Sequence, residues 1–131
     1  MAELNLIVVT PEKTALETKA EFVALTLFDG EVGIAPGRSP LIGRLGYGEM
    51  RLRSGGTTTH YYVDGGFVQV DDNVVSVLTG KAGPAGDLDP AEAQKNLEAA
   101  QPLPSNTPEL MEIRDRTVLQ ARGQLRVANR A

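Results

Sequence analysis

Short apolar runs alternating with polar residues occupy the first two thirds of this 131-residue chain. Alternation with a period of two places apolar side chains on one face of a β-strand. Clusters of Gly, Asp, Asn and Thr-Pro separate the runs, as tight turns do. The predicted strands are residues 4–9, 23–27, 50–53, 61–63, 67–70 and 74–78, and the predicted turns are 10–13, 54–56, 64–66 and 71–73. With no helix-length periodic segment between them, these strands predict an antiparallel β-sandwich or barrel over residues 1–84.

The pattern changes at a Gly- and Pro-rich linker. Asp89-Pro90-Ala91-Glu92 is a capping sequence and predicts a helix that runs to about residue 100, where prolines follow. Thr107-Pro108 repeats this start, and the second predicted helix runs to Ala128. Two helices joined by a short loop form an antiparallel hairpin. Residues 85–131 are therefore expected to be a two-helix hairpin.

The apolar side of both predicted helices consists mostly of small residues. These positions are Ala93, Leu97 and Ala100 in the first helix, and Met111, Val118, Ala121, Leu125 and Ala128 in the second. Because burial contributes roughly 25 cal/mol per Å² of apolar area, alanine contributes little. Gly123 is placed in mid-helix, where glycine costs about 1 kcal/mol relative to alanine. We expect a weakly held appendage whose stability depends on docking, which suits a part that moves between partners.

Composition narrows the class of protein. The net charge of −4 argues against a general nucleic-acid binder, and the absence of Cys excludes disulfides and thiolate metal sites. Aromatic residues are only 5%, so the core must be built from Val, Leu, Ile and Ala. No apolar run approaches the ~20 residues of a membrane span, and Met1-Ala2-Glu3-Leu4 does not resemble the start of a signal peptide. We expect a soluble, intracellular protein that reaches a membrane only through a protein partner.

The segment Asp29–Leu41 is dense in residues that fix the backbone path, with three glycines and two prolines in thirteen positions. It reads D-G-E-V-G-I-A-P-G-R-S-P-L and resembles the G-E-(L/V)-G-I-x-P-G-H-x-P-L segment of the epsilon subunit of F-type ATP synthases. Four further segments resemble that family in the same order: Val8–Glu12, Asp64–Val70, Asn73–Leu78 and Gln124–Val127. The resemblance therefore covers nearly the whole chain.

The resemblance implies an N-terminal sandwich of about ten strands that binds the gamma subunit and the c-ring as the foot of the rotating central stalk. It implies no catalysis by the chain itself. It also implies a C-terminal hairpin that either folds on the sandwich or extends along gamma to the alpha and beta subunits and inhibits ATP hydrolysis. Family contacts with the ring make Glu31, Gly33 and Arg38 the candidate foot residues, although Arg38-Ser39 replaces the usual His and small residue.

Some members of the family bind ATP through an I/L-D-x-x-R-A motif at the start of the hairpin, helped by arginines of the last helix. The matching positions here are Asp89 in the motif and Arg122 and Arg126 in the helix. Glu92 replaces the motif arginine, and an acid repels phosphate instead of pairing with it. We expect ATP binding to be weak or absent, and no cofactor or metal.

The segment from residue 114 to the end of the given sequence contains five arginines but only one acid, Asp115. The arginines are Arg114, Arg116, Arg122, Arg126 and Arg130. One interpretation is a basic helix that contacts acidic loops of the catalytic subunits. The other is a solvated helix end whose cations complement the helix dipole. The sequence leaves both interpretations open, and Arg114, Arg122 and Arg126 are the candidate interface residues.

Two other functions are weighed against the rotor subunit. A free-standing β-sandwich binding module with a helical dimerisation element is one, but a chain without Trp lacks the usual aromatic platform for glycans. A hydrolase using His60, the only histidine, is the other. A lone His cannot build a zinc site, and a strand-surface position is the better interpretation of His60. The resemblance to the epsilon family implies instead a peripheral subunit on the cytoplasmic face of the bacterial plasma membrane.

Overall fold

The computed structural model describes residues 3–130, without the side chain of Arg130. Met1 and Ala2, which form half of the segment compared with a signal peptide, lie outside the described residues, as does Ala131. Among the described residues, no helix combines the length and the apolar character needed to span a membrane.

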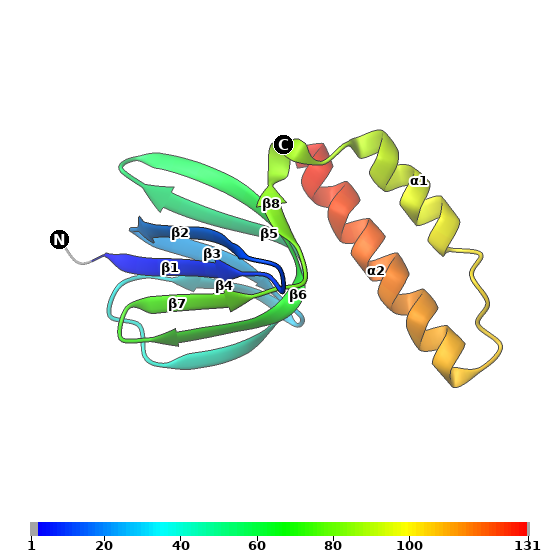
Figure 1. Cartoon of the computed structure of the whole chain (residues 1–131), viewed down its shortest axis with the longest axis horizontal. Coiled ribbons are helices and arrows are strands. Elements are labelled where there is room, and N and C mark those ends of the chain that lie inside the picture. Colours follow the sequence, from blue (N-terminus) through cyan, green and yellow to red (C-terminus); the bar gives the residue numbers. More distant parts are fainter. Residues whose placement is uncertain (1–2, 131) are drawn as a thin grey trace.

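Eight strands and two long helices follow one another along the chain (Figure 1). The elements are β1 (Leu4–Val9), β2 (Thr14–Ala20), β3 (Phe22–Leu27), β4 (Gly30–Ile34), β5 (Leu41–Ser54), β6 (Thr57–Asp71), β7 (Val74–Leu78), β8 (Ala82–Pro84), the 3-10 turn η1 (Ala85–Asp87), α1 (Pro90–Ala100) and α2 (Pro108–Arg130). The strand order is β2-β1-β7-β6-β5-β3-β4, and β8 pairs with β6. The predicted sandwich followed by a helical pair is confirmed, and β1 and β7 have the predicted bounds.

The expected antiparallel sheet of about ten strands needs two corrections, because the described part of the chain has eight strands and the sheet is mixed. β1 pairs antiparallel with β2 but parallel with β7, in a register that sets Asn5 opposite Val74. The alternation of apolar residues identifies a strand but does not say from which direction its neighbour arrives. A strand between two neighbours that run in opposite directions is necessarily parallel to one of them.

The predicted turn at residues 64–66 is also wrong, since this segment lies inside the continuous strand β6. Gly65 and Gly66 have φ angles of 71° and 105°, which glycine adopts readily, so the strand changes course without ending. An added Cβ on Gly66 would lie 1.9 Å from the carbonyl oxygen of Leu78, so the end of β7 passes directly over it. The two glycines therefore serve strand bending and close packing, and the two predicted strands around them are halves of one.

The main core lies between the faces of the sandwich and is aliphatic, as the low aromatic content predicted. Its buried members are Leu4, Leu6, Val8, Ala20, Val23, Leu25, Ile34, Leu45, Met50, Leu52, Val63, Val68, Val70, Val75 and Val77. Branched side chains of this kind pack well on a pleated surface and supply most of the buried apolar area.

Both helices begin where the sequence predicts. The Asp89 carboxylate accepts a hydrogen bond from the Ala91 amide at 2.9 Å, and Thr107 Oγ1 accepts one from the Leu110 amide at 3.1 Å. These bonds satisfy donors that a helix start leaves open. α1 and α2 pack against each other and project from the end of the sandwich at which β5 and β6 bend (Figure 1).

Candidate partner interfaces

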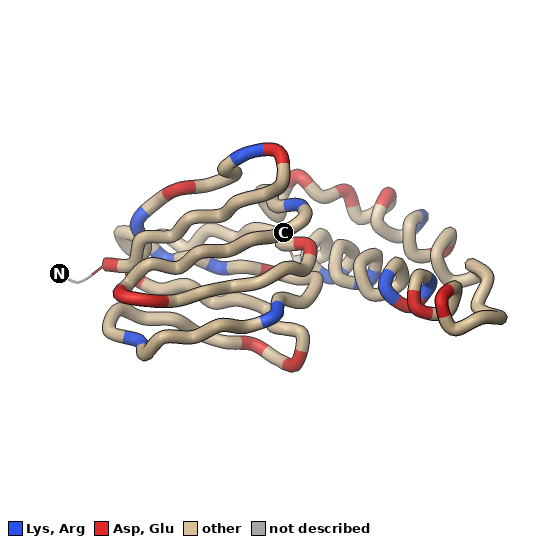
Figure 2. Tube along the Cα trace, turned by 60° about the horizontal axis from the view of Figure 1, so that its bottom comes forward, with Lys and Arg blue, Asp and Glu red and all other residues tan. Residues whose placement is uncertain are grey.

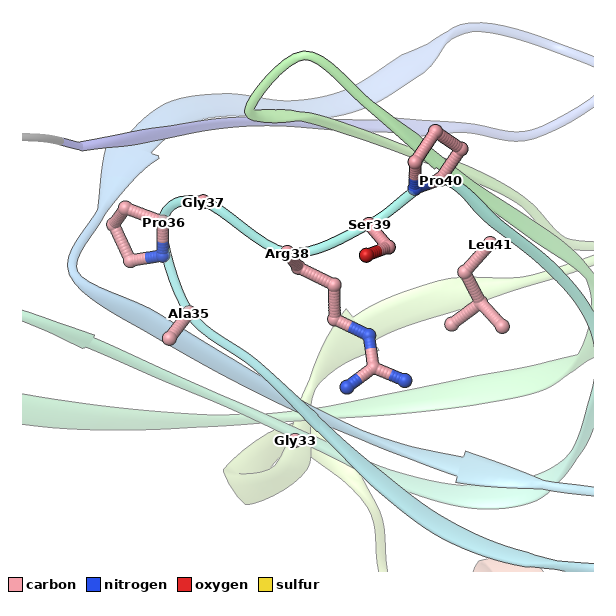
Figure 3. A pocket seen from close by; sticks show the side chains of 8 residues that line it. All are labelled: Gly33, Ala35, Pro36, Gly37, Arg38, Ser39, Pro40 and Leu41. Atoms are coloured by element: carbon pink, nitrogen blue, oxygen red, sulfur yellow. The ribbon is translucent and has the colours of Figure 1, made fainter.

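The loop between β4 and β5 carries the segment that resembles the family foot. Residues Ala35–Leu41 curve around a shallow hollow of about 530 Å³, with Gly33 at its edge and the Arg38 side chain across it (Figure 3). Gly37 has a φ of 84°, and its amide donates to Asn73 Oδ1 at 2.8 Å. The loop is therefore shaped by its own backbone and tied to the β6–β7 turn, while Arg38 stays exposed.

Glu31 lies in β4 and is not joined to Arg38 by any interaction among the described residues. It pairs with Arg51 Nη2 at 2.5 Å, and Arg51 Nη1 also reaches the buried Glu49 carboxylate at 3.1 Å. Hydrogen bonds from Arg51 to Glu49 and then to Glu31 raise the pKa of Arg51 above its usual range. His60 Nδ1 lies 3.2 Å from the other Glu49 oxygen. Sequence reasoning missed this cross-strand cluster, because the pairing of β3, β5 and β6 brings its members together.

The surroundings of His60 and Gly33 explain why these residue types occur at these positions. His60 is an exposed residue of β6, opposite Arg51, in the strand-surface position that the sequence favours. Gly33 leaves room for the Phe22 ring, whose Cζ would lie 2.7 Å from an added Cβ. The close approach of this ring gives Gly33 a packing role besides its place at the foot loop.

The second surface is where α2 docks on β5 and β6. An added Cβ on Gly123 would lie 2.3 Å from the Tyr47 carbonyl oxygen and 2.8 Å from its Cβ. Any side chain at position 123 would therefore push α2 away from the sandwich. In the sequence, Gly123 could be interpreted only as a residue that lowers the stability of its helix. In the structure, the absence of a side chain at Gly123 allows α2 to approach β5 closely.

A polar cluster adjoins this contact. Asp64 accepts hydrogen bonds from Gln120 Nε2 at 3.0 and 2.8 Å and from the Tyr62 hydroxyl at 2.7 Å. Burial, and then the bond to Asp64, raise the pKa of Tyr62 well above its ordinary value. Tyr62 also packs in a small buried cluster with Ala85 and Val127. The hydrogen bonds to Asp64 and the buried cluster around Tyr62 thus hold α2 on the sandwich.

Burial within the hairpin follows the prediction in part. Ala93, Ala100, Val118, Ala121 and Ala128 are buried as expected. Met111 was expected on the packed face but is 49% exposed, because the first half of α2 extends beyond the strands. Val127, which was not among the expected positions, is 1% exposed because it enters the cluster around Tyr62.

The basic residues of α2 divide into two groups. Arg114 Nε donates to the Gln101 carbonyl at 2.9 Å, and Arg114 Nη1 pairs with Asp115 at 3.2 Å, so Arg114 fastens the connector between the helices. Arg116, Arg122 and Arg126 are exposed. Charged positions of both signs gather on the part of α2 nearest the connector (Figure 2). Arg130 lies outside the described side chains.

The residues considered for nucleotide binding do not line a common hollow. Asp89 borders a hollow of about 140 Å³ together with Lys81, Asp87 and Glu92, so three acids face one lysine there. Arg122 and Arg126 are not among its lining residues. Within residues 3–130, no group of three or more His, Asp or Glu side chains is placed to hold a metal ion.

Comparison with known proteins gives one consistent result. Residues 3–85 match the family model described as ATP synthase, Delta/Epsilon chain, beta-sandwich domain. A Rhodopirellula baltica protein named ATP synthase epsilon chain is 54% identical over 125 residues, covering 95% of this chain and 98% of that protein. A second epsilon chain, from Nitratidesulfovibrio vulgaris, is 37% identical over 98 residues, covering 75% of this chain and 73% of its own length.

Two solved structures share the fold. A chain of the Euglena gracilis mitochondrial ATP synthase, solved as OSCP/F1/c-ring, superposes with a TM-score of 0.85 at 22% identity, over 98% of this chain and 82% of that one. A chain of the Tetrahymena thermophila mitochondrial ATP synthase central stalk/c-ring gives a TM-score of 0.68 at 14% identity, over 95% and 96%. Both matches include the hairpin as well as the sandwich, since they span 98% and 95% of this chain.

Proposed function

This chain belongs to the delta/epsilon chain family of ATP synthases, and on that premise we propose that it is a rotor subunit without an active site of its own. Its sandwich (residues 1–84) joins the gamma subunit to the c-ring, and its hairpin (residues 85–131) regulates ATP hydrolysis by reaching the alpha and beta subunits. It acts as a peripheral part of a proton-translocating enzyme, on the cytoplasmic face of the plasma membrane.

The foot loop supports the role at the ring. Its backbone is fixed by Gly37 and by the bond to Asn73, so the exposed Arg38 is presented from a stiff support. A surface that transmits torque must be rigid. The hydrogen bond from the middle of the loop to the β6–β7 turn restricts the movement of the loop. Glu31 and Gly33 support the same region from β4, through the Arg51 pair and the Phe22 contact.

The observation that carries the regulatory proposal is the narrow docking contact of α2. Gly123 against Tyr47, and Gln120 with Asp64, hold the helix without adding a residue of α2 to the main core. Breaking such a contact exposes the small cluster of Tyr62, Ala85 and Val127 but none of the main core, so the hairpin can leave the sandwich while the sandwich stays folded. The released α2 then offers Arg122 and Arg126 to acidic loops of the catalytic subunits.

We expect the hairpin to act without binding a nucleotide. The acids around Asp89 repel phosphate, and a hollow of about 140 Å³ is too small for a drug-sized ligand, which takes roughly 300 Å³ or more. The position of the hairpin is then set by its contacts with the sandwich and with neighbouring subunits.

The test is ATP hydrolysis by the reconstituted catalytic complex with the full chain and with a chain ending at Gly86. We expect the truncated chain to bind and hydrolysis to rise several-fold, because the inhibitory helix is gone. A full chain carrying Arg122→Glu and Arg126→Glu is the matched variant and should relieve inhibition without removing the hairpin. Equal hydrolysis with all three chains bound would refute inhibition, and failure of both the full and truncated chains to bind would refute the rotor role.

A further inference from the structure

Charged side chains form a chain across the outer face of the sheet, from a buried carboxylate to an exposed one. Glu49 and Arg51 flank the core residue Met50 on β5, so both belong to its outer face. The side chain of Glu49 is 6% exposed, that of Arg51 37%, and that of Glu31 on β4 54%. Arg51 Nη1 lies 3.1 Å from Glu49 Oε1, and Arg51 Nη2 lies 2.5 Å from Glu31 Oε1. One guanidinium therefore joins a carboxylate inside the protein to one that faces outward.

The buried end of this chain of charges is fixed at both carboxylate oxygens. Glu49 Oε1 accepts a hydrogen bond from Arg51 Nη1, and Glu49 Oε2 lies 3.2 Å from His60 Nδ1. The backbone at this point is also held, because the Glu49 carbonyl accepts a hydrogen bond from Thr26 Oγ1 at 3.0 Å. Burying a carboxylate is costly unless its oxygens are paired, so Glu49 keeps this arrangement. Arg51 is thus held on one side by an acid with little freedom to move.

The exposed end lies on β4, the last strand of the sheet. β4 pairs only with β3, so Arg51 reaches from β5 across β3 to find Glu31. The β3 residue opposite Arg51 is the small Ala24. An edge strand has backbone hydrogen bonds on one side only. The pair between Arg51 and Glu31, which is the one ion pair of β4 within residues 3–130, therefore restricts Glu31 beyond what the strand pairing does.

The balance of charge leaves Glu31 as the group that can bind something else. Arg51 offsets only one of the two carboxylates, and Glu49 is both buried and bound at each oxygen. Glu31 is bound through Oε1, and its Oε2 accepts no hydrogen bond from the described part of the chain. A carboxylate held by one oxygen presents the other in a defined direction, where it fits a hydrogen-bond donor of a partner.

We infer that Arg51 and Glu49 are positioning residues for the contact of Glu31 with the c-ring, an inference that rests on the function proposed above. Glu49 orients Arg51, and Arg51 holds the Glu31 carboxylate. A half-exposed glutamate alone samples several rotamers, and fixing one in advance removes that entropic cost from the contact. Because an ion pair at this exposure adds little to the stability of the fold, its main effect is on orientation.

The experiment measures coupling in membrane vesicles, as ATP synthesised per proton transported by the complete enzyme with each variant chain. Arg51→Lys keeps the charge but loses the planar fork that reaches two carboxylates, and Glu49→Gln loses the charge that holds Arg51. We expect each to lower coupling several-fold, toward the value for Glu31→Gln. Arg53→Lys is the matched control and should leave coupling unchanged, because Arg53 follows on the same face of β5 but pairs with Glu21.

Double variants separate positioning from a purely structural role. In the Glu31→Gln chain, adding Arg51→Lys should cause no further loss of coupling, because Arg51 acts through Glu31. Should Arg51→Lys fail to assemble, Glu49→Gln in the same two chains decides the question.

Three results would overturn the inference. They are normal coupling in Arg51→Lys or Glu49→Gln, an equal further loss in the Glu31→Gln chain, and loss of assembly in both Arg51→Lys and Glu49→Gln. If Glu31→Gln itself has no effect, the inference falls together with the ring contact of Glu31. In each of these cases the rotor function stands if the chain co-purifies with gamma, and falls if it does not.

Discussion

The sandwich and the hairpin are held by different kinds of contact. Fifteen buried aliphatic residues join the faces of the sandwich, and none of them comes from the helices. The hairpin is held by alanines between its own helices and by one narrow contact around Gly123 and Asp64. The sandwich therefore has the stability of a core, and the position of the hairpin depends on a few atoms. This division fits the proposed function, in which the sandwich transmits force and the hairpin changes position.

The largest expected effect comes from opening the sandwich core. Leu25 is fully buried, so Leu25→Ala removes buried apolar atoms and leaves a cavity, which should lower the free energy of unfolding by about 2–5 kcal/mol. Urea unfolding followed by circular dichroism measures the loss. Leu103→Ala in the partly exposed connector is the comparison and should change it by under about 0.5 kcal/mol. A similar loss in both variants would remove the contrast between the two regions.

The second effect should be confined to the hairpin. Gly123→Ala raises helix propensity by about 1 kcal/mol but puts a Cβ against the Tyr47 carbonyl, so α2 should undock while remaining helical. Hydrogen exchange should show lost protection in Gln120 and its neighbours and unchanged protection in β1 and β7. Gly86→Ala has open space around it and is the matched control. Full protection of α2 in Gly123→Ala would show that the close contact does not hold the helix.

Structural features that depend on neighbouring residues could be predicted from the sequence, and contacts between distant segments could not. Strand alternation and helix caps depend on neighbouring residues, so β1, β7 and the helix starts at Pro90 and Pro108 could be predicted. The parallel pairing of β1 with β7 depends on where a distant strand arrives. From the sequence, Gly66 was interpreted as part of a turn, and Gly123 as a residue that destabilises its helix. Their close contacts could not be predicted, because the backbone that passes near each glycine belongs to a segment distant in the sequence.

For the candidate partner interfaces, the sequence likewise predicted a location but not the contacts of the residues in it. Family resemblance made the loop between β4 and β5 the candidate for contact with the ring, and its fixed backbone matches the glycine and proline content. The partners of its residues were not predictable, since Glu31 finds Arg51 only through strand pairing. Glu49 has no distinguishing pattern in the sequence, because only the pairing of β5 with β6 brings His60 to its carboxylate.

A third effect concerns alkaline pH. The pKa of Tyr62 is raised in the folded protein, so the folded state holds this proton more tightly than the unfolded chain does. The stability from Tyr62 is complete below the ordinary tyrosine pKa of about 10 and is lost as pH rises above it. Backbone amides exchange too fast between pH 9 and 11 for hydrogen exchange to follow α2. The measurement is therefore the rate of trypsin cleavage after Arg122, corrected for the activity of the protease at each pH. Tyr62→Phe should weaken this pH dependence, and the same steep dependence in Tyr62→Phe would exclude Tyr62 as its source.

The smallest expected effect on stability is at the foot. Glu31 and Arg51 are half-exposed, so Glu31→Gln should change the free energy of unfolding by no more than about 1 kcal/mol. If Glu31 serves the ring contact, coupling of proton transport to ATP synthesis in membrane vesicles should fall although the fold is intact. Glu12→Gln in an exposed turn is the control. A large loss of stability would make Glu31 a structural residue of the sandwich.

The most direct test of the division between the two regions is ATP hydrolysis by the assembled complex carrying Gly123→Ala. If the docked hairpin is the permissive state, releasing it should lower hydrolysis several-fold relative to the native chain and to Gly86→Ala. The chain ending at Gly86, which lacks α2 altogether, should not show this loss. Unchanged hydrolysis by a complex in which hydrogen exchange shows α2 released would contradict the account, because the hairpin would then move without controlling the enzyme.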